Sequence, residues 1–188
     1  DRVLAGGPEK KSRIISEKEK RVTAWHEAGH AIVGHMLAHM DPIHKITIIP
    51  RGRAMGYTMF LPVEDRYNVS KSELLDRMAM ALGGRAAEEI TFGEITSGAH
   101  DDIERTTNMA RRMVTEWGMS EKLGPLTFGT KQEEVFLGRD IARQRNYSED
   151  VAALIDEEVR RFVHEAYERA KQILITHQDA LNKLGEVL

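Results

Sequence analysis

The stretch VTAWHEAGHAIVGHMLAHM, residues 22–40, carries two histidines four positions apart, with a glutamate directly after the first. A helix turns by about 100° per residue, so His26 and His30 project from one face and can reach one ion. Glu27 lies beside that face, where its carboxylate can contact a water without binding the ion. The spacing therefore predicts a helix that holds a metal site with a base next to it.

The residues around the histidine pair indicate that it points into the protein. Its side of a helical wheel is shared by Val22, Gly29, Val33 and Leu37. Inward-facing imidazoles carry a desolvation cost unless they are satisfied, and a zinc ion would satisfy both. The alternative is a pair of buried structural histidines that are satisfied by hydrogen bonds alone.

Composition narrows the chemistry of such a site. The chain has 188 residues, 41% of them hydrophobic, a net charge of −3 and no cysteine. Disulfides and thiolate ligands are excluded, so a metal must use imidazole and carboxylate. The charge gives no case for a nucleic-acid partner. Because the chain does not begin with Met and has no apolar run of about 18 residues, we expect a fragment without a membrane span.

Capping patterns and turn residues predict a mainly α fold with a small β-hairpin or sheet next to the HExxH helix. Ser16 with Glu19 and Ser70 with Glu73 form S-x-x-E capping boxes. We expect a linker at 1–15 and one domain at 16–188. Within the domain, the expected helices span about 17–39, 71–90, 100–117 and 149–176, with a short one from 179, and the β-rich runs are 44–50 and 56–62.

A catalytic zinc site usually has three protein ligands and one open position, so a third ligand must be found. The candidates further along the chain are Glu88, Glu89, His100, Asp101 and Asp102. Asp102 projects about 50° from the centre of the apolar face that runs from Ile103 to Trp117, whereas Asp101 projects about 150° away. Capping of the helix is the alternative role for Asp102, and the missing ligand favours the metal. Glu89 is predicted to be an outer partner of a ligand histidine, or the fallback third ligand.

Taken together, the sequence resembles the protease domain of the FtsH family, membrane-anchored AAA zinc metalloproteases. The similar stretches cover nearly the whole chain in family order: TAWHEAGHAIV, DPIHKITIIPRGRAMGYTMFLP, LGGRAAEEITFG, TSGAHDDIERTTNMARRMVTEWGMSEKLGP and VFLGRD. The resemblance implies that His26, His30 and Asp102 bind one Zn²⁺ per chain and that Glu27 is the catalytic base. Asp101 stands where the family usually has Asn.

The resemblance also implies a larger assembly. Family members carry N-terminal transmembrane helices and an AAA ATPase module in cis, on the cytoplasmic side of the bacterial inner membrane. They act as homo-hexamers that feed unfolded or membrane-extracted proteins to the protease. No GxxxxGK[ST] phosphate loop occurs in this chain, so ATP is expected only in the missing module. The alternative function is a non-catalytic helical oligomerisation module with a structural metal, based on the long helix at 149–176.

Overall fold

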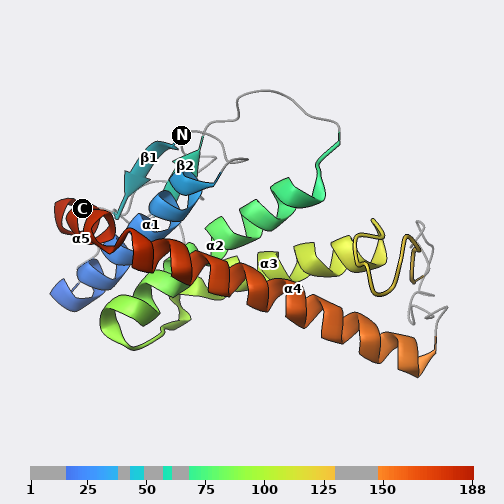
Figure 1. Ribbon diagram of the computed structural model, residues 1–188. Coiled ribbons are helices and arrows are strands. Elements are labelled where there is room, and N and C mark those ends of the chain that lie inside the picture. The colour runs from blue at the N-terminus through green and yellow to red at the C-terminus, as the bar shows by residue number, and fades with distance from the viewer. Residues whose placement is uncertain (1–15, 38–42, 49–56, 61–67, 130–147) are drawn as a thin grey trace, which may run out of the picture. The chain divides into compact units, whose positions relative to one another are not determined.

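The computed structural model describes residues 16–37, 43–48, 57–60, 68–129 and 148–188 (Figure 1). This part of the chain contains five α-helices, one short 3₁₀ helix and one pair of strands, so the predicted mainly α class is confirmed. The elements in chain order are α1 (Glu17–Met36), β1 (Ile43–Thr47), β2 (Tyr57–Phe60), α2 (Lys71–Phe92), η1 (Ser97–Ala99), α3 (His100–Thr115), α4 (Glu149–Thr176) and α5 (Gln178–Val187). None of the described helices has the length and apolar character that a membrane span requires.

The helix starts follow the capping boxes of the sequence. The Ser16 hydroxyl accepts from the Glu19 N–H at 3.1 Å, and the Ser70 hydroxyl accepts from the Glu73 N–H at the same distance. These bonds satisfy amide groups that have no partner within the first turn, which fixes the start of α1 and α2. The end of α2 is set by Gly93, whose φ of 68° is left-handed and favours glycine.

The two strands pair antiparallel, with Lys45 opposite Met59 and Thr47 opposite Tyr57. Both strands contact α1. The residues that join them, 49–56, lie outside the described part of the chain, so a hairpin connection stays a prediction. The predicted linker at 1–15 lies outside it as well.

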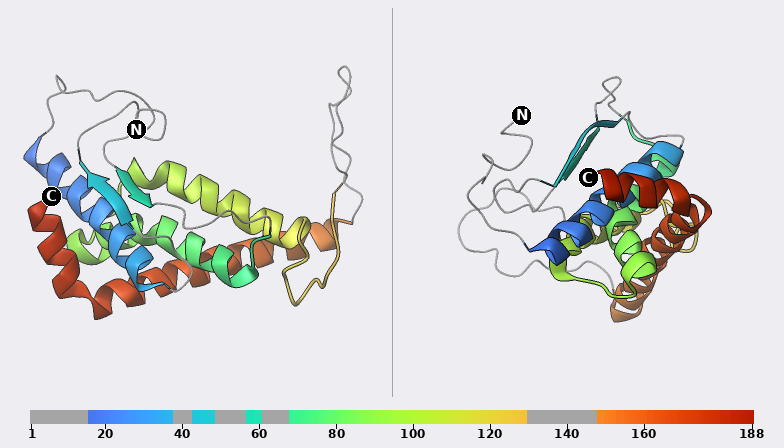
Figure 2. Two further views of the ribbon diagram at one scale, coloured as in Figure 1. Left: turned by 90° about the horizontal axis from the view of Figure 1, so that it is seen from above. Right: turned by 90° about the vertical axis from the view of Figure 1, so that its left-hand side faces the viewer.

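The chain forms two compact units. The first comprises residues 1–106 and 165–188, and the second comprises residues 107–164. In the first unit α1 is central: it contacts α2, α5 and both strands. The views in Figure 2 show the strand pair and α2 on different sides of α1. The histidine-bearing helix is thus covered on several sides, and α2 is the longest of the elements that cover it.

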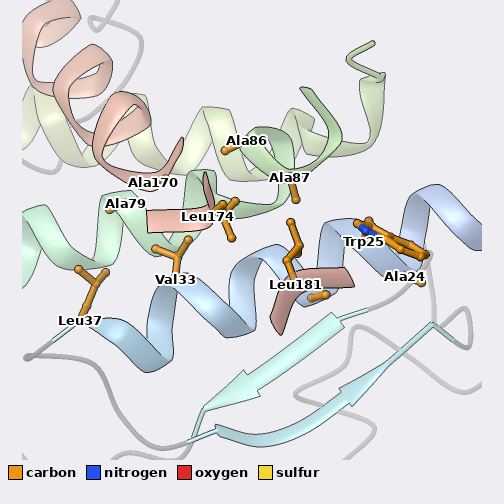
Figure 3. Packing of buried hydrophobic residues seen from close by; sticks show 11 residues of the cluster. Ala24, Trp25, Val33, Leu37, Ala79, Ala86, Ala87, Ala170, Leu174 and Leu181 are labelled. Carbon is orange, nitrogen blue, oxygen red and sulfur yellow. The ribbon is translucent and has the colours of Figure 1, made fainter. Parts of the chain in front are cut away.

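The core of the first unit is built on the inward face of α1 (Figure 3). Large side chains such as Trp25, Leu174 and Leu181 pack among alanines of α1, α2 and α4. The Trp25 indole N–H donates to the Asn182 side-chain oxygen at 3.1 Å, which joins α1 to α5. The small residues allow close helix contacts, and the large ones fill the space between them.

Close approach of α1 and α2 depends on glycine. A Cβ at Gly29 would lie 2.3 Å from the backbone oxygen of Gly83, and a Cβ at Gly84 would lie 2.4 Å from Nε2 of His26. No side chain fits at those distances. Gly83 therefore lets α1 and α2 touch, and Gly84 leaves room for the imidazole ring of His26.

The second unit has its own buried side chains. They include Ala110, Met113 and Val114 from α3 and Ile155, Val159 and Phe162 from α4. The carboxylate of Glu158 is buried there and accepts from the Ser120 hydroxyl at 2.6 Å. The Arg161 guanidinium, which donates to the same carboxylate, lowers the pKa of Glu158 to about 2 although burial opposes this.

The expected burial of Trp117 is wrong. α3 ends at Thr115, and Trp117 is 41% exposed. Three residues beyond the helix, at Gly118, the backbone turns with φ of 58°, so the helical phase used for the prediction no longer applies. Val114 is buried on this part of the chain instead.

Candidate metal centre

Three of the predicted site residues converge in the first unit. Nε2 of His26 and Nε2 of His30 lie 3.0 Å apart, and each lies 3.2 Å from Oδ2 of Asp102. The imidazoles come from successive turns of α1, and the carboxylate comes from the first turn of α3. Both histidines are buried, and the Asp102 side chain keeps 17% of its surface exposed. One side of the cluster therefore remains open to solvent.

The separations between these atoms fit a tetrahedral zinc site. Bonds of about 2.0–2.2 Å at tetrahedral angles place neighbouring ligand atoms roughly 3.3–3.5 Å apart. The observed 3.0–3.2 Å is within a few tenths of an ångström of that spacing. The donor set consists of two imidazole nitrogens and one carboxylate oxygen, and one side is left open. Catalytic zinc sites use this arrangement.

Each imidazole is fixed through its other nitrogen. Nδ1 of His26 lies 2.6 Å from Oε2 of Glu88, and Nδ1 of His30 lies 2.8 Å from the backbone oxygen of Met80. Carboxylate and carbonyl oxygens only accept, so both Nδ1 atoms carry the proton and donate. α2 thus supplies the partners that orient both rings toward Asp102.

This arrangement leaves three acceptors facing one another. With the protons on Nδ1, the lone pairs of both Nε2 atoms point at the Asp102 carboxylate. Buried acceptors at about 3 Å repel unless a cation or a proton lies between them. The chemistry of the donor set therefore fits a divalent cation.

The same crowding shifts the pKa values of the cluster. Burial lowers the pKa of His26, but hydrogen bonds with Asp102 and Glu88 outweigh it and raise the pKa to about 10. Burial acts against charge on Asp102 as well, yet the two imidazoles hold the pKa of Asp102 well below its usual range. Protons and a metal ion consequently compete for the same nitrogen atoms.

The structure places Glu88 beside His26, whereas Glu89, which the sequence predicted as that outer partner or as the third ligand, is bonded elsewhere. Glu89 points to α4, where its carboxylate accepts from the Tyr167 hydroxyl and lies 3.4 Å from Nζ of Lys171. Glu88 is 1% exposed and faces His26. The hydrophobic pattern did not indicate which face of α2 packs against α1. The closest contact is made by Gly83 and Gly84, and glycine contributes almost nothing to such a pattern.

Glu27, the predicted base, is 5% exposed and lies on α1 next to His26. The remaining third-ligand candidates lie elsewhere: His100 and Asp101 are exposed on the first turn of α3, where they form a second cluster with Glu104. His100 Nε2 lies 3.3 Å from Oε2 of Glu104 there. Asp102 therefore differs from His100 and Asp101 in the direction of its side chain, which faces His26 and His30.

Sequence reasoning named Glu88 only as a candidate third ligand, missed its contact with His26, and did not single out Thr96. Oε1 of Glu88 accepts from the Thr96 backbone N–H at 3.1 Å and from its hydroxyl at 2.6 Å. Glu88 stands four residues after Gly84, which places the two on one face of α2. A glycine in a helix interior often marks close packing, and that signal could have identified Glu88.

Comparison with known proteins places the chain among peptidases. The model of Peptidase family M41 matches residues 13–188. The whole chain aligns at 83% identity over 188 residues with ATP-dependent zinc metalloprotease FtsH 3 of Symbiobacterium thermophilum. It aligns at 56% identity over 189 residues with ATP-dependent zinc metalloprotease FtsH of Bacillus subtilis. The chain spans about 30% of the length of these two relatives.

Proposed function

The chain belongs to peptidase family M41 as the zinc metalloprotease domain of the FtsH type, and we propose that it hydrolyses peptide bonds at the cluster on α1 and α3. The observation that carries the proposal is the convergence of His26, His30 and Asp102 on one point that is open on one side. One zinc ion per chain would be held by these three side chains.

Each residue has a separate task in the proposed reaction. Zinc bound at the cluster supplies Lewis-acid chemistry, which acidifies water and polarises a carbonyl. Glu27 takes a proton from the attacking water and passes it to the leaving amine. Glu27 directly follows His26 on α1, so its carboxylate would stand beside a bound ion without being a ligand. Glu88 and the Met80 carbonyl keep the imidazoles in the ligating orientation.

We propose a wider setting from the relatives, both of which are described as ATP-dependent. An AAA ATPase module in cis would supply unfolded or membrane-extracted protein substrates to a homo-hexamer of these domains. Membrane contact would be made by segments outside this chain, at the cytoplasmic side of the bacterial inner membrane. ATP would bind only to the ATPase module.

Replacing Glu27 by Gln tests the catalytic part of the proposal. The variant should bind zinc as tightly as the unsubstituted chain and lose about 10²–10⁴-fold in cleavage of an unfolded substrate such as casein. Glu89→Gln is a matched control, because Glu89 contacts Tyr167 and not the cluster. Unchanged cleavage by Glu27→Gln would remove the residue from the mechanism and would favour a non-catalytic helical assembly module.

A further inference from the structure

Thr96 lies in the short segment between α2 and η1, where it is bonded in two directions. Its hydroxyl donates to Oε1 of Glu88 at 2.6 Å, and the same oxygen accepts from the Gly98 N–H at 3.2 Å. Because the acceptor side of the oxygen is used by Gly98, its single proton is directed at Glu88. The Thr96 backbone N–H donates to Oε1 as well, at 3.1 Å.

Through Glu88, Thr96 is connected to the imidazole of His26. With Oε1 held by two donors from Thr96, the other oxygen of Glu88 accepts from Nδ1 of His26 at 2.6 Å. Glu88 is 1% exposed, so water does not replace a lost partner easily. The orientation of the Glu88 carboxylate, and through it that of His26, depends on the Thr96 contacts.

Through η1, Thr96 is connected to the helix that carries Asp102. The bond from the Gly98 N–H caps η1, and η1 continues directly into α3, which carries Asp102 in its first turn. The residues from Gly93 to Gly98 are exposed, so little burial fixes their path. The contacts of Thr96 with Glu88 therefore join the start of α3 to the end of α2.

We propose that Thr96 is a positioning residue that holds two of the zinc ligands, His26 and Asp102, in place relative to each other. Through Glu88 it orients His26, and through η1 it places Asp102. The inference rests on the proposed zinc site and adds a residue that touches neither the ion nor a substrate. Its hydroxyl is the group that matters, so serine can replace threonine and valine cannot.

The test compares Thr96→Val with Thr96→Ser, using zinc affinity measured by competition with a chromophoric chelator. Valine keeps the shape and the backbone N–H but removes the hydroxyl. An outer partner of a ligand histidine contributes about 10–100-fold to metal affinity. For Thr96→Val, one bond further out, we expect a loss of about 5–10-fold, with a shifted visible spectrum of the cobalt(II)-substituted chain. Thr96→Ser should stay within about twofold of the unsubstituted chain.

Thr91→Val is the matched control. The Thr91 hydroxyl is buried, and no hydrogen-bond partner for it is found in the described part of the chain. Removing that hydroxyl should leave zinc affinity and the cobalt spectrum unchanged. If Thr96 merely stabilised the fold, Thr96→Val would lower the thermal midpoint of the chelated chain without changing either metal readout.

The outcomes separate the two proposals. Equal zinc affinity for Thr96→Val and the unsubstituted chain would overturn the role of Thr96 and leave the zinc site intact. Failure of Thr96→Ser to restore affinity would also overturn it, because a hydroxyl would then not be the group required. If the unsubstituted chain bound no zinc, or if His26→Ala bound it equally well, the zinc site itself would be refuted.

Discussion

Two clusters of histidine and carboxylate share the first turn of α3, and they differ in burial and in the elements that supply their side chains. The cluster of His26, His30 and Asp102 is buried, whereas the cluster of His100, Asp101 and Glu104 is exposed. Both bring three potential ligand atoms within 4.8 Å of one another. In the buried cluster, each imidazole also donates to a fixed acceptor behind it.

Nearness of ligand atoms is therefore a weak criterion for a metal site. The exposed cluster comes from one helical turn, and its members have water as an alternative partner. The buried cluster draws on α1 and α3 and is oriented by α2, so its three ligand atoms already lie within 3.2 Å of one another. A site that is organised in advance binds with a smaller ordering cost.

Removal of the metal should give the largest effect. Treatment with a strong zinc chelator is expected to abolish peptide cleavage, and one equivalent of zinc per chain should restore it fully. The exposed cluster should not bind a second zinc ion tightly, because its side chains are exposed. Zinc titration followed by activity gives the stoichiometry, and a requirement for two ions would break the comparison.

Substitution of two adjacent glutamates separates the outer partner from its neighbour. Glu88→Gln should weaken zinc binding by about 10–100-fold, because the amide holds the ring of His26 less firmly than a carboxylate does. Glu89→Gln should leave zinc affinity unchanged, since Glu89 is bonded to Tyr167. Chelator competition measures both variants. A larger loss for Glu89→Gln than for Glu88→Gln would contradict the assignment.

Much of the architecture was predictable from local sequence. The capping boxes at Ser16 and Ser70 gave the starts of α1 and α2, since a capping bond involves residues only three positions apart. α4 spans Glu149–Thr176, the range that its apolar spacing predicted. Such features depend on the chain's own neighbours and need no knowledge of tertiary packing.

The site was predictable in part, for a physical reason. His26, His30 and Asp102 are brought together as the helical geometry indicated. The contact of Glu88 with His26 was missed because the direction of Glu88 depends on glycines that bring α1 and α2 into contact, and hydrophobic patterns give glycine little weight. Thr96 was missed because its partner, Glu88, lies eight residues away across a helix end. Tertiary contacts of this kind have no short-range periodic signal.

Acidity should weaken the buried site. The pKa of His26 is raised from 6.5 to about 10, so the metal-free cluster holds protons that zinc must displace. Zinc affinity should rise between pH 7 and pH 9, by up to about tenfold per pH unit for each proton displaced. The stability that this imidazolium contributes to the chelated chain is fully present below 6.5 and is lost as pH rises toward 10.

Zinc titrations in pH-controlled buffers, with thermal unfolding of the chelated chain alongside, provide the measurement. Zinc affinity that does not change between pH 7 and pH 9 would mean that no proton competes with the metal. The raised pKa of His26 would then play no part in metal binding.

The smallest effect is expected in the exposed cluster. His100 and Glu104 are paired at 3.3 Å, but their side chains are 76% and 61% exposed. Exposed ion pairs contribute roughly 0–1 kcal/mol, so Glu104→Gln should change the free energy of unfolding by less than about 0.5 kcal/mol. Chemical denaturation measures the difference. A large loss of stability or of zinc affinity in Glu104→Gln would show that the exposed cluster stabilises the fold or binds zinc.

The zinc affinity of Asp102→Asn, compared with that of Asp101→Asn, tests most directly whether Asp102 completes the zinc site. The two variants change adjacent carboxylates to the same amide, and only one of them faces His26 and His30. We predict that Asp102→Asn loses more affinity than the roughly 10–100-fold typical of an outer partner, while Asp101→Asn stays within about twofold. Full zinc binding by Asp102→Asn, with cleavage retained, would show that Asp102 is not a zinc ligand.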